Sequence, residues 1–188
     1  MQQFINYLNA ISPLSEAAQK AIEEKCVLKK HSKNHILVSD LATCDKYFFI
    51  INGLLRIYYV KDDREITDWF GEENTLVGPL ASGLKLPNAQ HSIELLEDST
   101  LIQVSLWDLE LLCAEFHEIQ RLARLIAIHT AIKLQYKIES MLFLTAQQRY
   151  EEFMKNHPSI MQRVSLGHIA SYLGMNQVTL SRARSKKS

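Results

Sequence analysis

The chain contains 188 residues, of which 47% are hydrophobic and 22% are charged, and its 21 basic residues balance its 21 acidic residues. This composition is typical of a folded globular protein and excludes a chain that is disordered over most of its length. The N-terminus has no basic segment followed by an apolar run, and no window approaches the roughly 20 apolar residues that span a bilayer. We therefore expect a soluble, cytoplasmic protein without a signal peptide or a membrane contact.

Residues 1–25 have the pattern of one or two short amphipathic helices, with Phe4, Tyr7 and Leu8 on one apolar face. Ser12 followed by Pro13 is a standard helix start, with the serine as N-cap and the proline at the first helical position. We therefore predict a second helix that begins at Pro13.

From about Cys26 to Val104 the sequence changes to short runs of β-branched and aromatic residues. The run YFFIINGLLRIYYV, Tyr47–Val60, is interrupted at Asn52-Gly53, a pair that favours the tight turn of a β-hairpin. Two further strand segments follow, EITDWF and SIELLEDSTLIQVSL, and the second is divided by a polar turn at Glu97–Ser99. This series of short strands predicts an antiparallel barrel or sandwich.

Other residues of this region give more local expectations. The acidic pairs Asp62-Asp63 and Glu72-Glu73 are predicted to form solvated turns, because adjacent like charges are most stable in water. Trp69 and Trp107 are predicted to lie in the core.

No glycine or proline occurs between Leu106 and Gln148, and this stretch contains a long helix candidate, Glu118–Thr145. Its apolar residues form two stripes, one at roughly heptad spacing and one beside it. The first stripe is Leu125, Ile128, Ile132, Gln135 and Leu142, and the second is Ile126, His129, Ile132, Tyr136 and Phe143. We expect one face to cover the β-domain and the other to pair with a second copy of the chain, with burial inside a monomer as the alternative.

The C-terminal residues fit a helix-turn-helix motif that begins at Leu166. Ala170 then stands where the two helices cross closely, and Gly174 stands where the turn requires a positive φ. Asn176 is expected to cap a second helix over Gln177–Ser185. The residues expected in the small core are Ile169, Leu173, Leu180 and Ala183, and those expected to face outward are Gln177, Val178, Ser181, Arg182 and Ser185.

The charge of the chain is unevenly distributed despite its formal balance. Glu152 is the last acidic residue, and the six basic residues after it are Lys155, Arg163, Arg182, Arg184, Lys186 and Lys187. Residues 1–152 therefore carry a net charge of −6, and residues 153–188 carry +6. A basic module on an acidic body suits binding to a polyanion such as DNA.

The cysteines and histidines do not indicate a metal centre or a catalytic site. Cys26, Cys44 and Cys113 are widely spaced, odd in number and form no CxxC pair, so a disulfide framework, a zinc site and an iron–sulfur cluster find no support. His31 and His35 allow a cupin-type metal site as an alternative, but no glutamate stands at the matching spacing. We predict surface histidines, no metal, no catalytic residues and no enzyme activity.

Three segments give the chain a resemblance to the Crp/Fnr family of bacterial transcriptional regulators over roughly residues 25–188. They are FIINGLLRIYY (49–59), EDSTLIQVSLWDLE (97–110) and RVSLGHIASYLGMNQVTLSRAR (163–184). The resemblance implies an α+β fold with an N-terminal β-roll of the cyclic-nucleotide-binding type (a double-stranded β-helix), a long dimerisation helix and a C-terminal helix-turn-helix domain. The corresponding boundaries are 1–117, 118–145 and 146–188. It also implies a homodimer on a palindromic double-stranded DNA operator, with RNA polymerase as a further partner.

The resemblance also implies which residues contact DNA. By motif position, base and phosphate contacts fall on Gln177, Val178, Ser181 and Arg182, and Arg182 is the best candidate for bidentate readout of a guanine. Thr179 is expected to meet phosphate. The basic residues expected to add backbone contacts are Arg184, Lys186 and Lys187.

The segment expected to hold an effector departs from the pattern of family members that respond to cyclic nucleotides. In those members a Gly-Glu pair and a later Arg-Ser/Thr-Ala hold the ribose and the phosphate. Here VGPLASGLKLPNAQHSIEL (77–95) keeps Gly78 but has Pro79 for the Glu and Ala89-Gln90 for the Arg-Ser. An alanine does not offset the charge of a phosphodiester, and Lys85 is a poor replacement because it lies in an expected loop. The residues expected to line an effector pocket are Val77, Gly78, Pro79, Leu80, Ala89 and Gln90.

We therefore expect no cofactor and no cyclic nucleotide bound in the usual mode. The motif and the charge favour a DNA-binding regulator, and two other functions stay open. One is a small-molecule-binding or cupin-like metal protein whose C-terminal helices only pack. The other is a DNA-binding regulator whose sensor domain binds no ligand.

Overall fold

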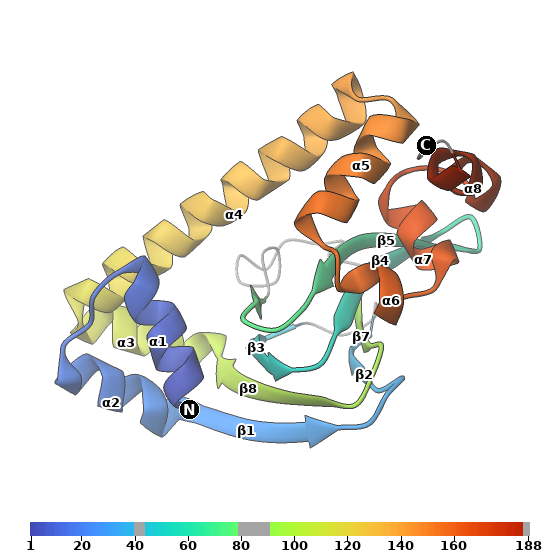
Figure 1. Cartoon of the computed structure of the whole chain (residues 1–188). Coiled ribbons are helices and arrows are strands. Elements are labelled where there is room, and N and C mark those ends of the chain that lie inside the picture. The colour runs from blue at the N-terminus through green and yellow to red at the C-terminus, as the bar shows by residue number, and fades with distance from the viewer. Residues whose placement is uncertain (40–43, 79–90, 186–188) are drawn as a thin grey trace.

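The computed structural model describes residues 1–39, 44–78 and 91–185. In these ranges, two N-terminal helices precede a β-domain, and a helical half follows it (Figure 1). The N-terminal helices are α1 (Gln2–Ile11) and α2 (Glu16–Lys25). The later helices are α3 (Leu106–Glu115), α4 (His117–Phe143), α5 (Ala146–Asn156), α6 (Ile160–Arg163), α7 (Leu166–Tyr172) and α8 (Gln177–Ser185).

The β-domain consists of two four-stranded sheets in which hydrogen-bonded neighbours are antiparallel. Sheet A has the strand order β1-β8-β3-β6, and sheet B has the order β2-β7-β4-β5. The strands are β1 (Cys26–His31), β2 (Ile36–Val38), β3 (Lys46–Asn52), β4 (Leu55–Lys61), β5 (Arg64–Gly71), β6 (Leu76–Val77), β7 (Ser92–Leu95) and β8 (Ser99–Ser105). The predicted antiparallel barrel or sandwich is therefore confirmed.

Alternation along β3 divides its apolar residues between two cores, because successive side chains point to opposite faces of a strand. Phe48 and Ile50 face sheet B and pack in a buried cluster with Leu55 and Leu95. Phe49 faces the helices instead, in a cluster built from the residues Phe4, Ile5, Leu8, Ile22, Ile102, Leu112, Ile119 and Leu122. Sheet A is thus a wall between the interior of the β-domain and the layer formed by α1, α2, α3 and α4.

The pair Asn52-Gly53 does not form the predicted hairpin. β3 pairs with β6 and β8 in sheet A, whereas β4 pairs with β5 and β7 in sheet B, so the chain crosses between the sheets at this point. Gly53 has φ +119°, and its N–H donates to the Glu73 carboxylate over 2.9 Å. Gly53 therefore has the positive φ expected of a hairpin turn, but it lies in the connection between sheet A and sheet B.

The hairpin of this region lies at Asp62-Asp63, between β4 and β5. Both aspartates have positive φ, 51° and 57°, and the strands pair up to Lys61 opposite Arg64. This is the backbone of a two-residue turn whose twist matches that of the strands. The predicted solvated turn at Asp62-Asp63 is confirmed, since both residues are exposed.

The start of the second helix was predicted wrongly. Ser12 is the residue after α1, and its N–H donates to the Leu8 carbonyl. Ser15 is the N-cap of α2, where its side chain accepts the N–H of Ala18. Ser12 and Ser15 are three residues apart, and the prediction placed the cap at Ser12 because proline follows it.

Helix α4 matches the predicted helix over Glu118–Thr145 to within two residues. Ile119 and Leu122 are buried against the β-domain side. On the other side of the helix Ile128, Ile132 and Leu142 are 43%, 49% and 70% exposed. We call the residues of the first predicted stripe, Leu125, Ile128, Ile132, Gln135 and Leu142, the α4 seam.

The residues of the second predicted stripe do not share one environment, because some are packed and others are exposed. Ile126 packs against the helix-side core, but Tyr136 and Phe143 are 70% and 76% exposed.

Trp107, predicted to be a core residue, is 57% exposed on α3, and Trp69 is only half-buried on β5. No helix in the described ranges combines the length and the apolar character that crossing a membrane requires.

Candidate DNA-binding surface

Side-chain caps define where α7 and α8 begin. Ser165 Oγ accepts the N–H of His168 at the start of α7. Asn176 Oδ1 accepts the N–H of Thr179 over 2.8 Å at the start of α8. Each cap satisfies one of the backbone donors that a helix leaves unpaired at its first turn. The capping role predicted for Asn176 is confirmed.

The turn between the two helices is closed by backbone hydrogen bonds around Gly174. The N–H groups of Gly174 and Met175 donate to the carbonyls of Ser171 and Ala170, over 3.0 and 2.9 Å. Gly174 has φ +64°. This is the Schellman arrangement, in which glycine adopts the left-handed conformation without a Cβ penalty.

The α7 and α8 helices share a small buried core. Ala170, at the crossing point, is 2% exposed, and a larger side chain there would separate the helices. The predicted core residues Ile169, Leu173, Leu180 and Ala183 are all buried, together with Tyr150 and Phe153 of α5 and Ile160 of α6. The α7–α8 pair is therefore a packed unit with α5 and α6, and we call α5 to α8 the C-terminal module.

The outer face of α8 is polar, basic and open to solvent. Its exposed residues are Gln177, Val178, Ser181, Arg182, Arg184 and Ser185, and Thr179 is half-buried. Val178 is 60% exposed. The predicted outward residues therefore share one accessible surface. Lys186 and Lys187 lie outside the described residues.

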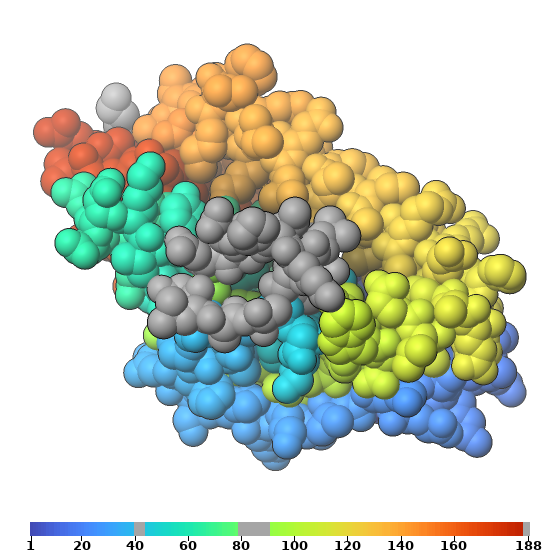
Figure 2. Space-filling model, turned by 180° about the vertical axis from the view of Figure 1, so that it is seen from behind, coloured from blue at the N-terminus to red at the C-terminus, as the bar shows by residue number. Residues whose placement is uncertain are grey.

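The C-terminal module packs against sheet B of the same chain. Ser171 of α7 accepts the N–H of Thr67 over 3.0 Å and donates to the Glu65 carbonyl, both on β5. Figure 2 shows the β4–β5 hairpin directly beside the module, in agreement with the packing of α7 on β5. Helix α4 joins this contact, because Lys137 bonds to the Asp68 carboxylate over 2.7 Å.

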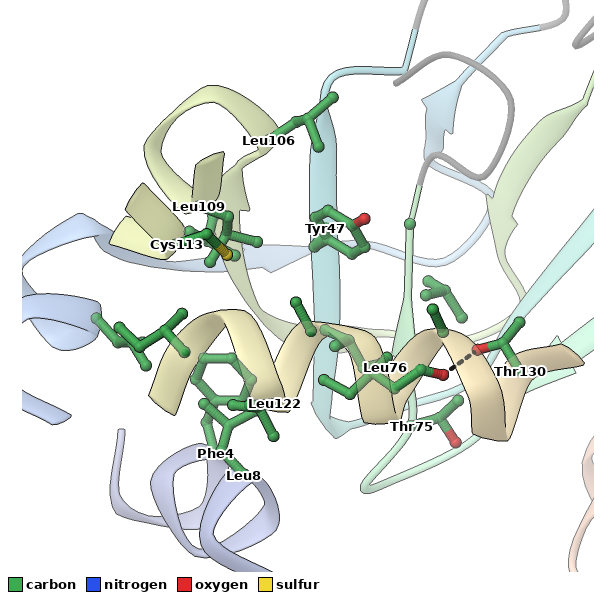
Figure 3. A pocket seen from close by; sticks show the side chains of 18 of the residues that line it. Phe4, Leu8, Tyr47, Thr75, Leu76, Leu106, Leu109, Cys113, Leu122 and Thr130 are labelled. Atoms are coloured by element: carbon green, nitrogen blue, oxygen red, sulfur yellow. Dashed lines mark hydrogen bonds between the residues drawn. The ribbon is translucent and has the colours of Figure 1, made fainter. Parts of the chain in front are cut away.

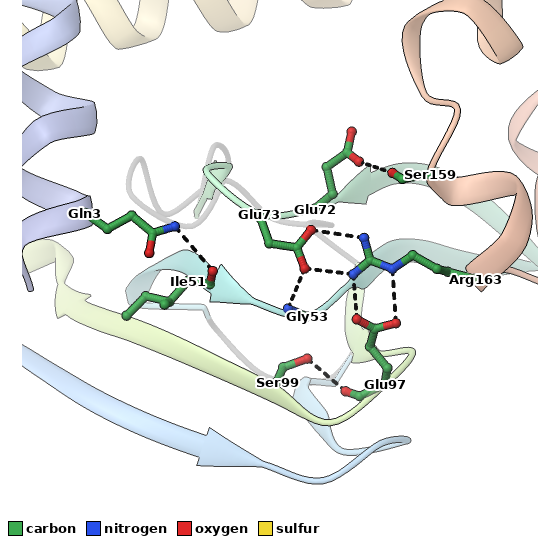
Figure 4. A network of polar contacts seen from close by, with 9 residues as sticks. All are labelled: Gln3, Ile51, Gly53, Glu72, Glu73, Glu97, Ser99, Ser159 and Arg163. Carbon is green, nitrogen blue, oxygen red and sulfur yellow. Dashed lines mark hydrogen bonds and ion pairs between the residues drawn. The ribbon is translucent and has the colours of Figure 1, made fainter.

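Arg163 forms the most extensive polar contact between the module and the β-domain (Figure 4). Its guanidinium donates to both oxygens of Glu73 over 2.9 and 3.0 Å, and also to both oxygens of Glu97. The Arg163 side chain is 21% exposed. We call this group, Arg163 with Glu73 and Glu97, the Arg163 clamp.

Glu72 adds a second contact next to the clamp. Ser159 donates to its Oε2 over 2.6 Å, and His157 Nδ1 lies 3.1 Å from its Oε1. The prediction that Glu72-Glu73 is a solvated turn is therefore wrong: the turn is present, but both carboxylates hold the C-terminal module. Arg163, counted above among the basic residues of that module, is directed toward the β-domain.

The Glu73 carboxylate of the clamp has a lowered pKa. Burial alone would raise the pKa of Glu73, but hydrogen bonds from the Arg163 guanidinium and the Gly53 amide outweigh it and lower the pKa below its ordinary value of 4.5. The carboxylates of Glu97 and Glu73 in turn raise the pKa of Arg163. A carboxylate with a depressed pKa stabilises the fold above its ordinary pKa, and this contribution is lost as the pH falls through the folded-state value.

We expect Arg163→Met to destabilise the protein by about 1–2 kcal/mol at neutral pH, more than an exposed pair, since Arg163 is mostly buried and bonded to two carboxylates. The loss should shrink as the pH falls below 4.5, where wild-type Glu73 also begins to lose its charge. Urea unfolding at several pH values measures both effects. Lys155→Met, at an exposed position of the same module, is the matched control, and equal stability of the two variants at neutral pH would contradict the prediction.

A buried arginine lies under α7. Arg56 of β4 is 4% exposed, bonds to Glu94 and Glu65, and lies with its guanidinium carbon 4.1 Å from the centre of the Tyr58 ring. Burial and the charge of Arg56 lower the pKa of His168, the nearby histidine of α7. The strand pattern gave no signal for this ion group, because Arg56 occupies a position in an apolar run.

The residues predicted to line an effector pocket are only partly described. Val77 is buried on β6, and Gly78 follows it. A Cβ at Gly78 would lie 2.1 Å from the Tyr47 ring, so close packing alone requires glycine there. Pro79, Leu80, Ala89 and Gln90 lie outside the described residues.

The histidines considered for a metal site lie at the end of β1. The rings of His31 and His35 stack with centroids 4.4 Å apart, and His31 contacts Gln103. In residues 1–39, 44–78 and 91–185, no group of three or more side chains is arranged to hold a metal ion.

Comparison with known proteins places the fold. No protein-family model matches the sequence, and no curated protein matches it. Solved structures do match, at low sequence identity. FixK2 from Bradyrhizobium japonicum is 18% identical, with a TM-score of 0.73 over 86% of this chain and 83% of that one.

Two other structures extend the comparison. A protein from Eubacterium rectale assigned to the Crp/Fnr family of transcriptional regulators is 19% identical, with a TM-score of 0.70 over 95% of this chain and 85% of that one. The regulator CLP from Xanthomonas campestris, described as responsive to c-di-GMP, is 15% identical, with a TM-score of 0.69 over 92% and 91%. The chain therefore has the fold of the Crp/Fnr regulators, a β-roll followed by a long helix and a helical C-terminal module.

Proposed function

We propose that the protein is a sequence-specific DNA-binding transcriptional regulator, not an enzyme, and that it acts as a homodimer on a palindromic operator. The observation that carries this proposal is the exposed outer face of α8, which presents polar and basic side chains on a helix held by a well-packed partner. A short exposed helix of this kind fits the major groove, where side chains reach base edges. The likeness in fold to the Crp/Fnr regulators supports the same assignment.

The α4 seam supports the homodimer. Its isoleucines are close to half exposed in the single chain, and apolar residues at heptad spacing are typical of helices that pair lengthwise. Two-fold pairing along α4 would present two copies of α8 to one duplex. Half-sites about 34 Å apart, one helical turn, are then expected.

Cyclic nucleotides are not part of this proposal. The sequence has Ala89-Gln90 where nucleotide-responsive relatives are expected to have the phosphate-binding Arg-Ser. A buried phosphodiester without a paired cation is unfavourable. The sensor domain would then respond to another ligand or to none.

Selection of bound fragments from random DNA tests the proposal directly. We expect enrichment of a palindrome, and we expect affinity for it to fall steeply as salt is raised, because phosphate contacts dominate binding. A folded, full-length chain that enriches no sequence would refute the proposed function.

Arg182 provides the residue-level test. We expect Arg182→Ala to weaken operator binding by about 1–3 kcal/mol and to relax specificity at one base position of each half-site, as loss of a bidentate guanine contact would. Fluorescence anisotropy on operators changed at single positions measures this. Arg182→Lys is the control for charge: lysine keeps the attraction to phosphate but not the two-pronged geometry, so specificity at that position should still be lost. A uniform weakening on all sequences by both variants would assign Arg182 to the backbone instead.

A further inference from the structure

A cavity of about 250 Å³ lies between α4 and the edge of sheet A (Figure 3). Its lining is mostly apolar and comes from α1, α2, α3, α4 and the β-domain. One end is formed by Phe4, Leu8, Leu109, Cys113 and Leu122. Burial raises the pKa of the Cys113 thiol, so this end carries no thiolate at neutral pH.

The other end of the cavity is polar. Thr130 lies there, with its hydroxyl already donating to the Ile126 carbonyl over 2.9 Å (Figure 3). Asp68 and Lys133 also line this end. Asp68 is paired with Lys137, whereas Lys133 forms no ion pair or side-chain hydrogen bond within the described ranges. Among the described residues that line the cavity, Lys133 is thus the cation available to a bound molecule.

Two further groups shape the chemistry of the cavity. Burial raises the pKa of Tyr47, so its hydroxyl stays a neutral donor on the sheet side. Glu110 also lines the cavity, but it belongs to α3, at the apolar end. The cavity therefore has a cationic end and an end without cations among its described residues.

The dimensions favour an elongated ligand. The lining residues of α4 extend from Ile119 to Leu134, a rise of about 22 Å along a helix. An apolar cavity of roughly 150 Å³ accepts benzene, so this one has room for a larger molecule. A compact polar ligand would leave most of the apolar lining uncovered.

We propose that this cavity binds an amphipathic monocarboxylate, with its apolar tail toward Phe4 and Leu122 and its carboxylate at Lys133. Val77 and Gly78, two of the predicted effector residues, line this cavity, and the proposal adds to them the lining residues of α1, α3 and α4. Only its regulatory consequence rests on the proposed function; the binding itself does not.

The cavity wall continues into the contacts that hold the C-terminal module. Thr75 and Leu76 line the cavity, and only Asn74 separates them from Glu72 and Glu73. Glu72 accepts a hydrogen bond from Ser159, and Glu73 accepts hydrogen bonds from Arg163 (Figure 4). A ligand that displaces this short segment would therefore change how the module is held. Through this segment, a bound ligand would change the affinity of the C-terminal module for DNA.

Calorimetry on the full-length protein tests the site, with decanoate below its micelle concentration as the probe. We expect saturable binding, one decanoate per chain, and affinity about 10-fold to 100-fold weaker for decanol, which lacks the charge. Lys133→Gln should reduce the affinity for decanoate to that for decanol, and it should leave the affinity for decanol unchanged. Lys20→Gln, an exposed lysine of α2, is the matched control.

Filling the cavity provides a second, independent variant. Ala127 lines the cavity and is exposed, so Ala127→Phe should abolish binding of both probes while preserving the fold. Ala17→Phe, on the exposed face of α2, should change neither. Absence of saturable decanoate binding, equal affinity for decanol, or full binding by Ala127→Phe would each overturn the site.

The regulatory consequence is measured separately, as operator affinity with and without saturating decanoate. We expect a change that Lys133→Gln abolishes. An unchanged affinity, with decanoate bound in calorimetry, would overturn the effector role. A protein that binds decanoate but no DNA would uphold the site and refute the proposed function.

Discussion

Replacing Ile128 and Ile132 together by glutamate is expected to convert the protein into a monomer and to reduce operator affinity by about 100-fold or more. Both side chains belong to the α4 seam and are 43% and 49% exposed in the single chain, so the monomer should still fold. In a paired seam, by contrast, the two copies would bring four carboxylates into an apolar contact, where unpaired charge is strongly unfavourable. Sedimentation equilibrium and fluorescence anisotropy measure the two effects.

The matched control is Gln120→Glu, which adds one carboxylate at an exposed position of α4 outside the seam. This variant should remain dimeric and bind the operator normally. If the double variant stayed dimeric with unchanged circular dichroism, the second copy would have to pair through another surface.

Gly53→Ala is expected to destabilise the protein by about 3–5 kcal/mol, since it combines backbone strain with overpacking. Gly53 has φ +119°, which side-chain-bearing residues rarely adopt. A Cβ there would lie 2.5 Å from the Cβ and 2.8 Å from the Cα of Ser99, a buried residue at the start of β8. The backbone of the crossover would have to move apart. Denaturant unfolding measures the loss.

Gly167→Ala is the control for a general cost of replacing glycine. Gly167 lies in α7, and the nearest atom to an added Cβ is the end of the flexible Gln177 side chain, at 2.9 Å. Alanine also has the higher helix propensity, so stability should change little. A loss at Gly53 no larger than at Gly167 would show that the crossover tolerates rearrangement.

The α7–α8 pair was predictable from the sequence because its determinants are local. Asn176 caps α8, Gly174 supplies the left-handed residue of the turn, and Ala170 lies on α7, four residues before Gly174. Each of these interactions spans a few residues, so spacing along the chain is enough to place them. The same holds for the extent of α4, where glycine and proline are absent.

The partners of the strands were not predictable in the same way. Asn52-Gly53 supplies a positive φ both in a hairpin and in a crossover, and only the pairing of β3 and β4 with different sheets distinguishes the two. Pairing depends on residues such as those of β8, about 50 positions away. Local turn chemistry identified the bend but not the path of the chain after it.

The contacts that hold the C-terminal module could not be predicted from the sequence either, because they also join residues that are far apart along the chain. Arg163 and Glu73 are 90 positions apart, and in the sequence each is an ordinary charged residue. The exposure of Trp107 is a similar case, since its side chain lies on the outer face of α3. The cavity beside α4 likewise draws its lining from residues 4 to 134, which no spacing rule connects.

The Arg163 clamp has a consequence for thermodynamic measurements on DNA. Each arginine or lysine that neutralises a phosphate releases condensed counterions, and the slope of log affinity against log salt is about −0.9 per phosphate contacted. Because the Arg163 guanidinium is already bonded to Glu73 and Glu97, it adds nothing to this ion release. A dimer contains two copies of Arg163. Its slope should therefore be shallower by nearly two units than the slope calculated by counting every basic residue of the two C-terminal modules as a phosphate contact.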